Sequence, residues 1–123
     1  PELHLGDDVL VPDLAGWRRE RLTQLPGEAY FTLAPDWVCE VLSPSTERID
    51  RALKMRIYAR EGVEWLWLVN PLTRTLEVFR RGESFWQQLA VHDGDMQVRV
   101  EPFDAIELEL ARWWDDGSEP EKP

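Results

Sequence analysis

Residues 35–71, PDWVCEVLSPSTERIDRALKMRIYAREGVEWLWLVNP, contain the pattern that decides the fold. Within this stretch, residues 36–42 and 64–70 are apolar on both faces apart from their acids. Strands of this kind usually lie inside a sheet that is covered on both sides. We therefore expect two central strands.

A helix is expected between these strands, from about 46 to 61. Residues 43–46, SPST, supply helix-start residues, and Gly62 provides a natural stop. The expected apolar stripe of the helix consists of Ile49, Ala52, Leu53 and Ile57. Strand, helix and strand at this spacing predict a right-handed crossover between parallel neighbours.

The flanking segments predict further strands. Residues 8–15 form an apolar run, in which Pro12 favours an edge or a strand end. Later strands are expected at 74–80, 84–91, 96–100 and 106–110. The fold class is thus α/β, a mixed sheet with helical cover. We expect one domain over residues 1–112, lacking its N-terminal portion, and a flexible acidic tail over 113–123.

Bulk composition limits the classes of function. The chain has 123 residues, a net charge of −10 and one cysteine, Cys39, which excludes an internal disulfide and fits a reducing cytoplasm. No stretch approaches the roughly 20 apolar residues of a membrane span. The acidic charge argues against nucleic-acid binding, although residues 115–123 carry four of the acids and arginines cluster near the motifs below.

Glu40 is the most informative residue. Strand alternation places it on one face with Asp36, Val38 and Leu42, and a carboxylate among apolar neighbours requires a partner or a cation. An ion pair with an arginine and a metal site both satisfy this requirement. Asp36 and Glu40 are separated by roughly 13 Å of strand, whereas two oxygens on one Mg²⁺ lie within about 4.2 Å. Asp36 is therefore left out of the metal shell.

Asp13 and Lys54 are the other candidates. If residues 8–15 pair beside 36–42 in suitable register, Asp13 and Glu40 can converge on one hard cation. A solvated strand end is the alternative interpretation of Asp13. Lys54 lies with Asp50 and Tyr58 at the border of the buried helix face. An ordinary surface pair of Lys54 with Asp50 is the alternative.

Three segments resemble a known family: VPDLA with Asp13, PDWVCEVLSPST with Glu40, and DRALKMRIYAREGVEWLWLVNP with Lys54. Together they resemble the bacterial Uma-type putative restriction endonucleases, within the PD-(D/E)XK nuclease superfamily. The resemblance runs from about residue 7 to 80 and is weaker to 110. It implies a restriction-endonuclease-like α/β core with flanking helices.

The resemblance also implies a mechanism, the hydrolysis of DNA phosphodiester bonds by metal-activated water. Asp13, Glu40 and the backbone carbonyl of Val41 would hold Mg²⁺ or Mn²⁺, and Lys54 would assist. The superfamily lysine normally stands two residues after the second acid, where this chain has Leu42, so Lys54 is expected to replace it from the helix. Asp36 and Asp50 receive only supporting roles.

Two alternatives remain open from the sequence. The chain could be an inactive nuclease-fold protein that acts as a binding module, as its charge and Leu42 suggest. It could also be an unrelated α+β domain with a tryptophan-rich interface, for which Trp113 and Trp114 would dock on a partner. Double-strand cutting would favour a homodimer. The choice between DNA and RNA is not decided.

Overall fold

The fold is built on a five-stranded mixed sheet with the order β3-β4-β5-β6-β7. The computed structural model describes residues 1–44, 47–104 and 107–114. The strands are β3 (Leu14–Gly16), β4 (Trp37–Val41), β5 (Trp65–Asn70), β6 (Thr75–Arg81) and β7 (Trp86–Asp93). Helix α1 (Glu47–Arg60) connects β4 to β5, which are parallel, while all other neighbours in this sheet are antiparallel. The two central strands, the helix and the mixed sheet are as predicted.

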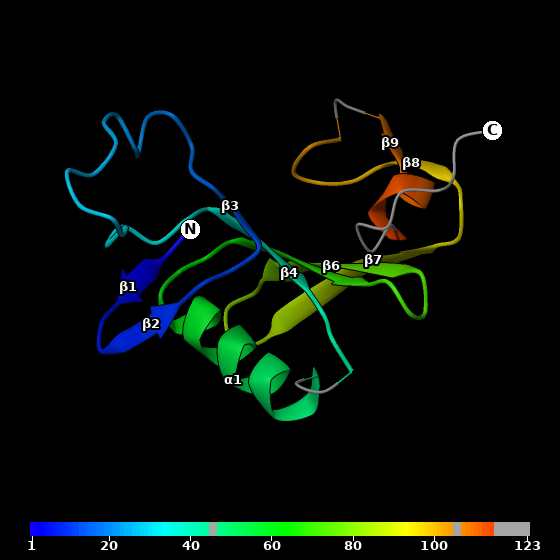
Figure 1. Cartoon of the computed structure of the whole chain (residues 1–123), viewed down its shortest axis with the longest axis horizontal. Helices are drawn as coiled ribbons and strands as arrows, with labels where there is room; N and C mark the ends of the chain where they lie inside the picture. Colours follow the sequence, from blue (N-terminus) through cyan, green and yellow to red (C-terminus); the bar gives the residue numbers. More distant parts are fainter. Residues whose placement is uncertain (45–46, 105–106, 115–123) are drawn as a thin grey trace.

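Different elements cover the two faces of the sheet (Figure 1). Helix α1 lies against one face, and the opposite face carries the hairpin of β8 (Gln97–Arg99) and β9 (Glu107–Glu109) with the short 3-10 helix η1 (Leu110–Trp114). A second hairpin, β1 (Leu3–Leu5) with β2 (Asp8–Leu10), completes the described structure. No helix in the described part of the chain has the length and apolar character of a bilayer span.

Alternation along the central strands divides the core in two. On the α1 side, Val38, Leu66 and Leu68 pack with residues of the helix and of the N-terminal hairpin. On the other side, Cys39, Trp67 and Val69 pack with residues of β6, β8 and η1. Each strand therefore needs apolar residues at successive positions, which explains why both segments are almost continuously hydrophobic.

The segment predicted as one strand over residues 8–15 is two strands, so this prediction was wrong in its extent. β2 pairs with β1, whereas β3 pairs with β4, and Pro12 and Asp13 lie between them. Proline has no N–H to donate to a ladder, which interrupts the strand at this point. Asp13 consequently stands where the chain enters the main sheet.

The predicted stripe of α1 is also partly wrong. Ile57 is buried as expected, but Leu53 is 50% exposed, and Tyr58 is fully buried. The side chain of Ile49 lies outside the described residues. The helix turns Lys54 and Tyr58 toward the sheet because a buried carboxylate on β4 accepts hydrogen bonds from both, and this orientation leaves Leu53 facing outward.

Trp113 and Trp114 do not form the exposed partner surface that the sequence suggested. Both are half-buried against the second core cluster, and the Trp114 indole donates a 2.6 Å hydrogen bond to the Gly94 carbonyl. The acidic tail was predicted over residues 113–123, so its predicted start was wrong: Trp113 and Trp114 belong to η1. Residues 115–123 lie outside the described residues.

The end of α1 provides a test of local backbone strain. Gly62 has a φ of +84°, and a Cβ at this position would have no atom within 4 Å. Gly62→Ala should lower the free energy of unfolding by about 1 kcal/mol, since an L-residue is strained in the left-handed region. Urea denaturation measures the change. Gly27→Ala is the control, because its Cβ would also lie in open space and its φ is not positive; equal effects of the two changes would contradict the strain explanation.

Candidate active site

The buried carboxylate of Glu40 is the centre of the candidate site. It lies in β4 beneath α1, with only 6% of the residue exposed. The Tyr58 hydroxyl donates a 2.8 Å hydrogen bond to Oε1, and the Lys54 ammonium lies 3.0 Å from Oε2. Lys54 and Tyr58 are four residues apart in the helix, so both point from the same face. Lys54 therefore pairs with Glu40. The surface pair with Asp50 considered from the sequence is not tested, because the Asp50 side chain lies outside the described residues.

Burial raises the pKa of Glu40 above its ordinary value. Loss of solvation is the largest cause; the hydrogen bonds from Tyr58 and Lys54 and the charge of Lys54 act in the opposite direction, while the nearby negative charge of Asp13 raises the pKa further. Two donors thus compensate only part of the cost of holding a carboxylate at this position. A cation in contact with Glu40 would favour the ionised form.

Asp13 lies directly before β3, the neighbour of β4 on the edge away from β5. Its Oδ2 accepts a 2.7 Å hydrogen bond from the backbone N–H of Val41. The register pairs Leu14 with Cys39, so one further step places Asp13 opposite Glu40, and directly opposed residues share a face of an antiparallel pair. The predicted site required residues 8–15 to pair beside residues 36–42. The part of that segment that forms β3 does so.

The Val41 carbonyl faces the same side as its N–H, because both groups of one strand residue point toward the same neighbour. The ladder of β3 with β4 ends at Leu14 and Cys39, two residues before Val41, and Pro12 has no N–H with which to extend it. The proline that interrupts the strand therefore leaves a backbone oxygen beside Asp13 without a ladder donor from β3.

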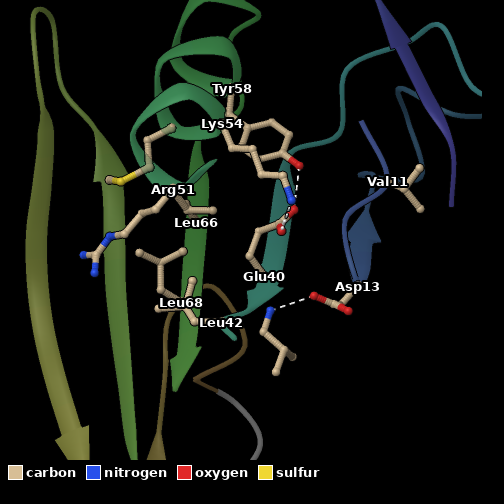
Figure 2. A pocket seen from close by; sticks show the side chains of 11 residues that line it. Val11, Asp13, Glu40, Leu42, Arg51, Lys54, Tyr58, Leu66 and Leu68 are labelled. Atoms are coloured by element: carbon tan, nitrogen blue, oxygen red, sulfur yellow. Dashed lines mark hydrogen bonds and ion pairs between the residues drawn. The ribbon is translucent and has the colours of Figure 1, made fainter. Parts of the chain in front are cut away.

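One cavity of about 220 Å³ brings these groups together. Its lining includes Asp13, Glu40, Val41, Lys54 and Tyr58, so each of the predicted site residues contributes to it. Figure 2 shows the Glu40 carboxylate turned toward Lys54 and Tyr58, while the Asp13 carboxylate is turned toward Val41. The two acids line one cavity but are held by different partners.

The donor set of this cavity fits a hard divalent cation. Within residues 1–44, 47–104 and 107–114, no group of three or more Asp, Glu, His or Cys side chains is placed to hold a metal ion. Two carboxylates and a carbonyl are nevertheless all oxygen donors, and Mg²⁺ is commonly held by one or two carboxylates with water and phosphate in the other positions. The raised pKa of Glu40 also marks a carboxylate that a cation would stabilise.

Asp36 lies at the other end of β4, as expected when it was left out of the metal shell. Its carboxylate pairs with Arg21 at 2.8 Å and accepts a 2.7 Å hydrogen bond from the backbone N–H of Arg18. Asp50 belongs to α1, but its side chain lies outside the described residues.

Tyr58 and Arg51 line the cavity without having been assigned roles from the sequence. Arg51 is held by Glu77 at 3.1 Å. The signal for Tyr58 was its position four residues after Lys54. A tyrosine at such a position is usually a packing residue, so only its hydrogen bond to Glu40 distinguishes it.

Comparison with known proteins identifies the family. The family model described as "Uma2: Putative restriction endonuclease" matches residues 2–111. The chain belongs to this family. No protein with a curated description matches the chain.

A solved structure has the same fold. It is a putative nuclease belonging to DUF820 from Anabaena variabilis, with a TM-score of 0.70 and 24% sequence identity. The alignment covers 92% of the present chain and 64% of the other, so this chain spans less than two thirds of that protein. The predicted restriction-endonuclease-like α/β fold is confirmed.

The raised pKa of Glu40 predicts a specific pH dependence of stability. A group with a raised folded-state pKa binds more protons when folded, so its contribution to stability falls as the pH rises from the ordinary value of 4.5 through the raised value. In urea denaturation with EDTA between pH 4 and 8, the wild type should therefore lose stability relative to Glu40→Gln as the pH rises.

The exposed acid Glu83 offers a control, Glu83→Gln, for the general effect of removing one negative charge. A wild type that gains stability relative to Glu40→Gln over the same range would show that the pKa of Glu40 is lowered, contrary to expectation.

Proposed function

We propose that this protein is a metal-dependent endonuclease that hydrolyses DNA phosphodiester bonds. The observation that carries the proposal is one cavity at the C-terminal end of β4, which is lined by Asp13, Glu40 and Lys54 together. Membership of the Uma2 family, described as putative restriction endonucleases, supports the nuclease class. Cys39, buried and without a disulfide, suits a cytoplasmic protein.

The metal would be Mg²⁺ or Mn²⁺, held by Asp13, Glu40 and the Val41 carbonyl. When bound, the ion supplies Lewis acidity, which lowers the pKa of a water and offsets charge on the phosphate. The protein's contribution is to fix these oxygens on a rigid strand. Asp13 is oriented by the Val41 N–H, and Glu40 is oriented by the Tyr58 hydroxyl.

Lys54 would act on the substrate from the helix. An ammonium can donate up to three hydrogen bonds, and the contact with Glu40 holds it in the cavity where a water or a phosphate oxygen would lie. In the superfamily pattern, the lysine belongs to the strand position that Leu42 occupies here. Leu42 lines the same cavity, and Lys54 brings its ammonium within 3.0 Å of Glu40 by another route. The cavity therefore still contains a lysine ammonium, although position 42 is a leucine.

DNA is the proposed substrate, although the chain is acidic. A bound divalent cation would offset part of the negative charge that repels DNA. The net charge of −10 includes the acids of the cavity, whose charge a bound divalent ion would offset. Cutting both strands of a duplex would need two such cavities, which a homodimer would supply.

Plasmid nicking with Mg²⁺ or Mn²⁺ tests the proposal. Asp13→Asn and Glu40→Gln should each reduce the nicking rate at least 100-fold while the fold is retained in circular dichroism. Lys54→Met should reduce the rate by roughly 10²-fold, the scale of a lost general acid or base.

Asp93→Asn is the control, because Asp93 is an exposed strand acid that does not line the cavity. It should leave the rate within about twofold. If wild type and Glu40→Gln show the same residual nicking, or if neither cuts, the nuclease proposal is wrong and a binding role for the fold is favoured.

A further inference from the structure

A second cavity, of about 200 Å³, lies at the opposite end of β4 and β5 from the candidate active site. Trp37 and Trp65, the first residues of the two strands, line it together with Phe103. Trp37 and Phe103 meet edge to face, with ring centroids 4.9 Å apart. Arg18 and Asp36 also line the cavity. Its walls are thus mainly aromatic, with charged groups among them.

Two hydrogen-bond donors in these walls lack an acceptor. The indole Nε1 atoms of Trp37 and Trp65 are buried, and neither has a hydrogen-bond partner among the described residues. Burying an N–H without an acceptor costs folding free energy, so such groups require an explanation. By contrast, four other indoles donate to backbone carbonyls: Trp17 to Leu33, Trp67 to Glu101, Trp86 to Met55 and Trp114 to Gly94.

A more open cavity of about 580 Å³ adjoins the aromatic one. Both are lined by Asp36, and the Arg80 guanidinium of the open cavity stacks 4.9 Å from the Trp65 ring centroid of the other. The arginines of the two cavities are Arg18, Arg21, Arg80 and Arg81, and the acids are Asp36 and Glu64. This end of the sheet therefore has an excess of positive charge in a chain whose net charge is −10.

We propose that the two cavities together bind a nucleotide, with the base in the aromatic cavity and the phosphate against the arginines. Aromatic walls stack on a planar base. The indole N–H groups of Trp37 and Trp65 are buried, so they would reach the acceptors of a base once the rings turn toward it. A volume of about 200 Å³ is smaller than the roughly 300–1,000 Å³ of a site for a complete drug-sized ligand, so it suits one ring system. The guanidinium groups outside it suit a phosphate.

The nucleotide can be free or part of a single strand, because both present the same base and phosphate. The short edge strand β3 connects the two regions: Asp13 precedes it at the candidate active site, and Arg18 follows it at the aromatic cavity. A single-stranded nucleic acid that runs along β3 would reach both the candidate active site and the aromatic cavity. The proposal itself uses no residue of the candidate active site and needs no metal.

Nuclear magnetic resonance of the full chain with EDTA tests the proposal. On titration with AMP or with a single-stranded hexamer of deoxyadenylate, the indole signals of Trp37 and Trp65 should shift, whereas those of Trp86 and Trp114 should not. Ribose 5-phosphate should bind at least tenfold more weakly than AMP, because it lacks the base. AMP binding as strong as that of the hexamer would assign the site to a free nucleotide, and a clear preference for the hexamer would assign it to a strand.

Substitutions provide a second measurement. The double change Trp37→Phe with Trp65→Phe keeps the rings but removes the two donors, and it should weaken binding at least fivefold, whereas Trp86→Phe should not. If the double variant fails to fold, Arg80→Gln serves, since Arg80 is half exposed. This change should weaken AMP at least threefold and leave adenosine unaffected, with Arg112→Gln as the control.

The proposal is overturned if neither AMP nor the hexamer shifts the signals of Trp37 and Trp65. Binding by the folded double variant that equals wild type would also overturn it. EDTA keeps the result separate from catalysis, so an absence of nuclease activity would leave this test unchanged.

Discussion

A carboxylate buried near the end of a central strand constrains the rest of this structure. Glu40 is 6% exposed, and a lone charge at such a position would oppose folding. Tyr58 and Lys54 compensate by turning one face of α1 toward β4, and this requirement fixes the rotation of the helix on the sheet. These two donors offset only part of the desolvation cost of the carboxylate, so the pKa of Glu40 is raised. Since apolar residues could fill the same space without this cost, we interpret the buried acid as functional.

The central unit of the fold could be predicted because its signals are local. Continuous apolar runs predicted β4 and β5, and Gly62 predicted the end of α1. The errors arose where tertiary contacts overrule a local pattern. Leu53 continues the apolar periodicity of the helix but is half exposed, because the hydrogen-bonding face takes the buried position. Pro12 indicated an edge, but the change of strand partner at that residue depends on pairings that are distant in sequence.

The candidate site was predictable in its residue types and less so in its geometry. Strand alternation singled out Glu40, strand pairing and helix position made Asp13 and Lys54 candidates, and the resemblance to the Uma-type family gave them roles; all three line one cavity. The hydrogen bond from Val41 to Asp13 could not be foreseen, since it depends on the register of β3 against β4. The same limit applies to the aromatic cavity. No spacing in the sequence distinguishes Trp37 and Trp65, whose indoles have no acceptor, from tryptophans whose indoles do.

The central claim is that Asp13 and Glu40 hold one divalent ion at the end of β4. The most direct measurement is the anomalous diffraction of a crystal soaked in Mn²⁺. The account predicts a peak between the two carboxylates, with the Val41 carbonyl among the ligands and distances near the roughly 2.0–2.2 Å of oxygen ligands to small divalent ions. Absence of a peak in this cavity from crystals that hold Mn²⁺ elsewhere, or a peak bound by only one of the two acids, would contradict it.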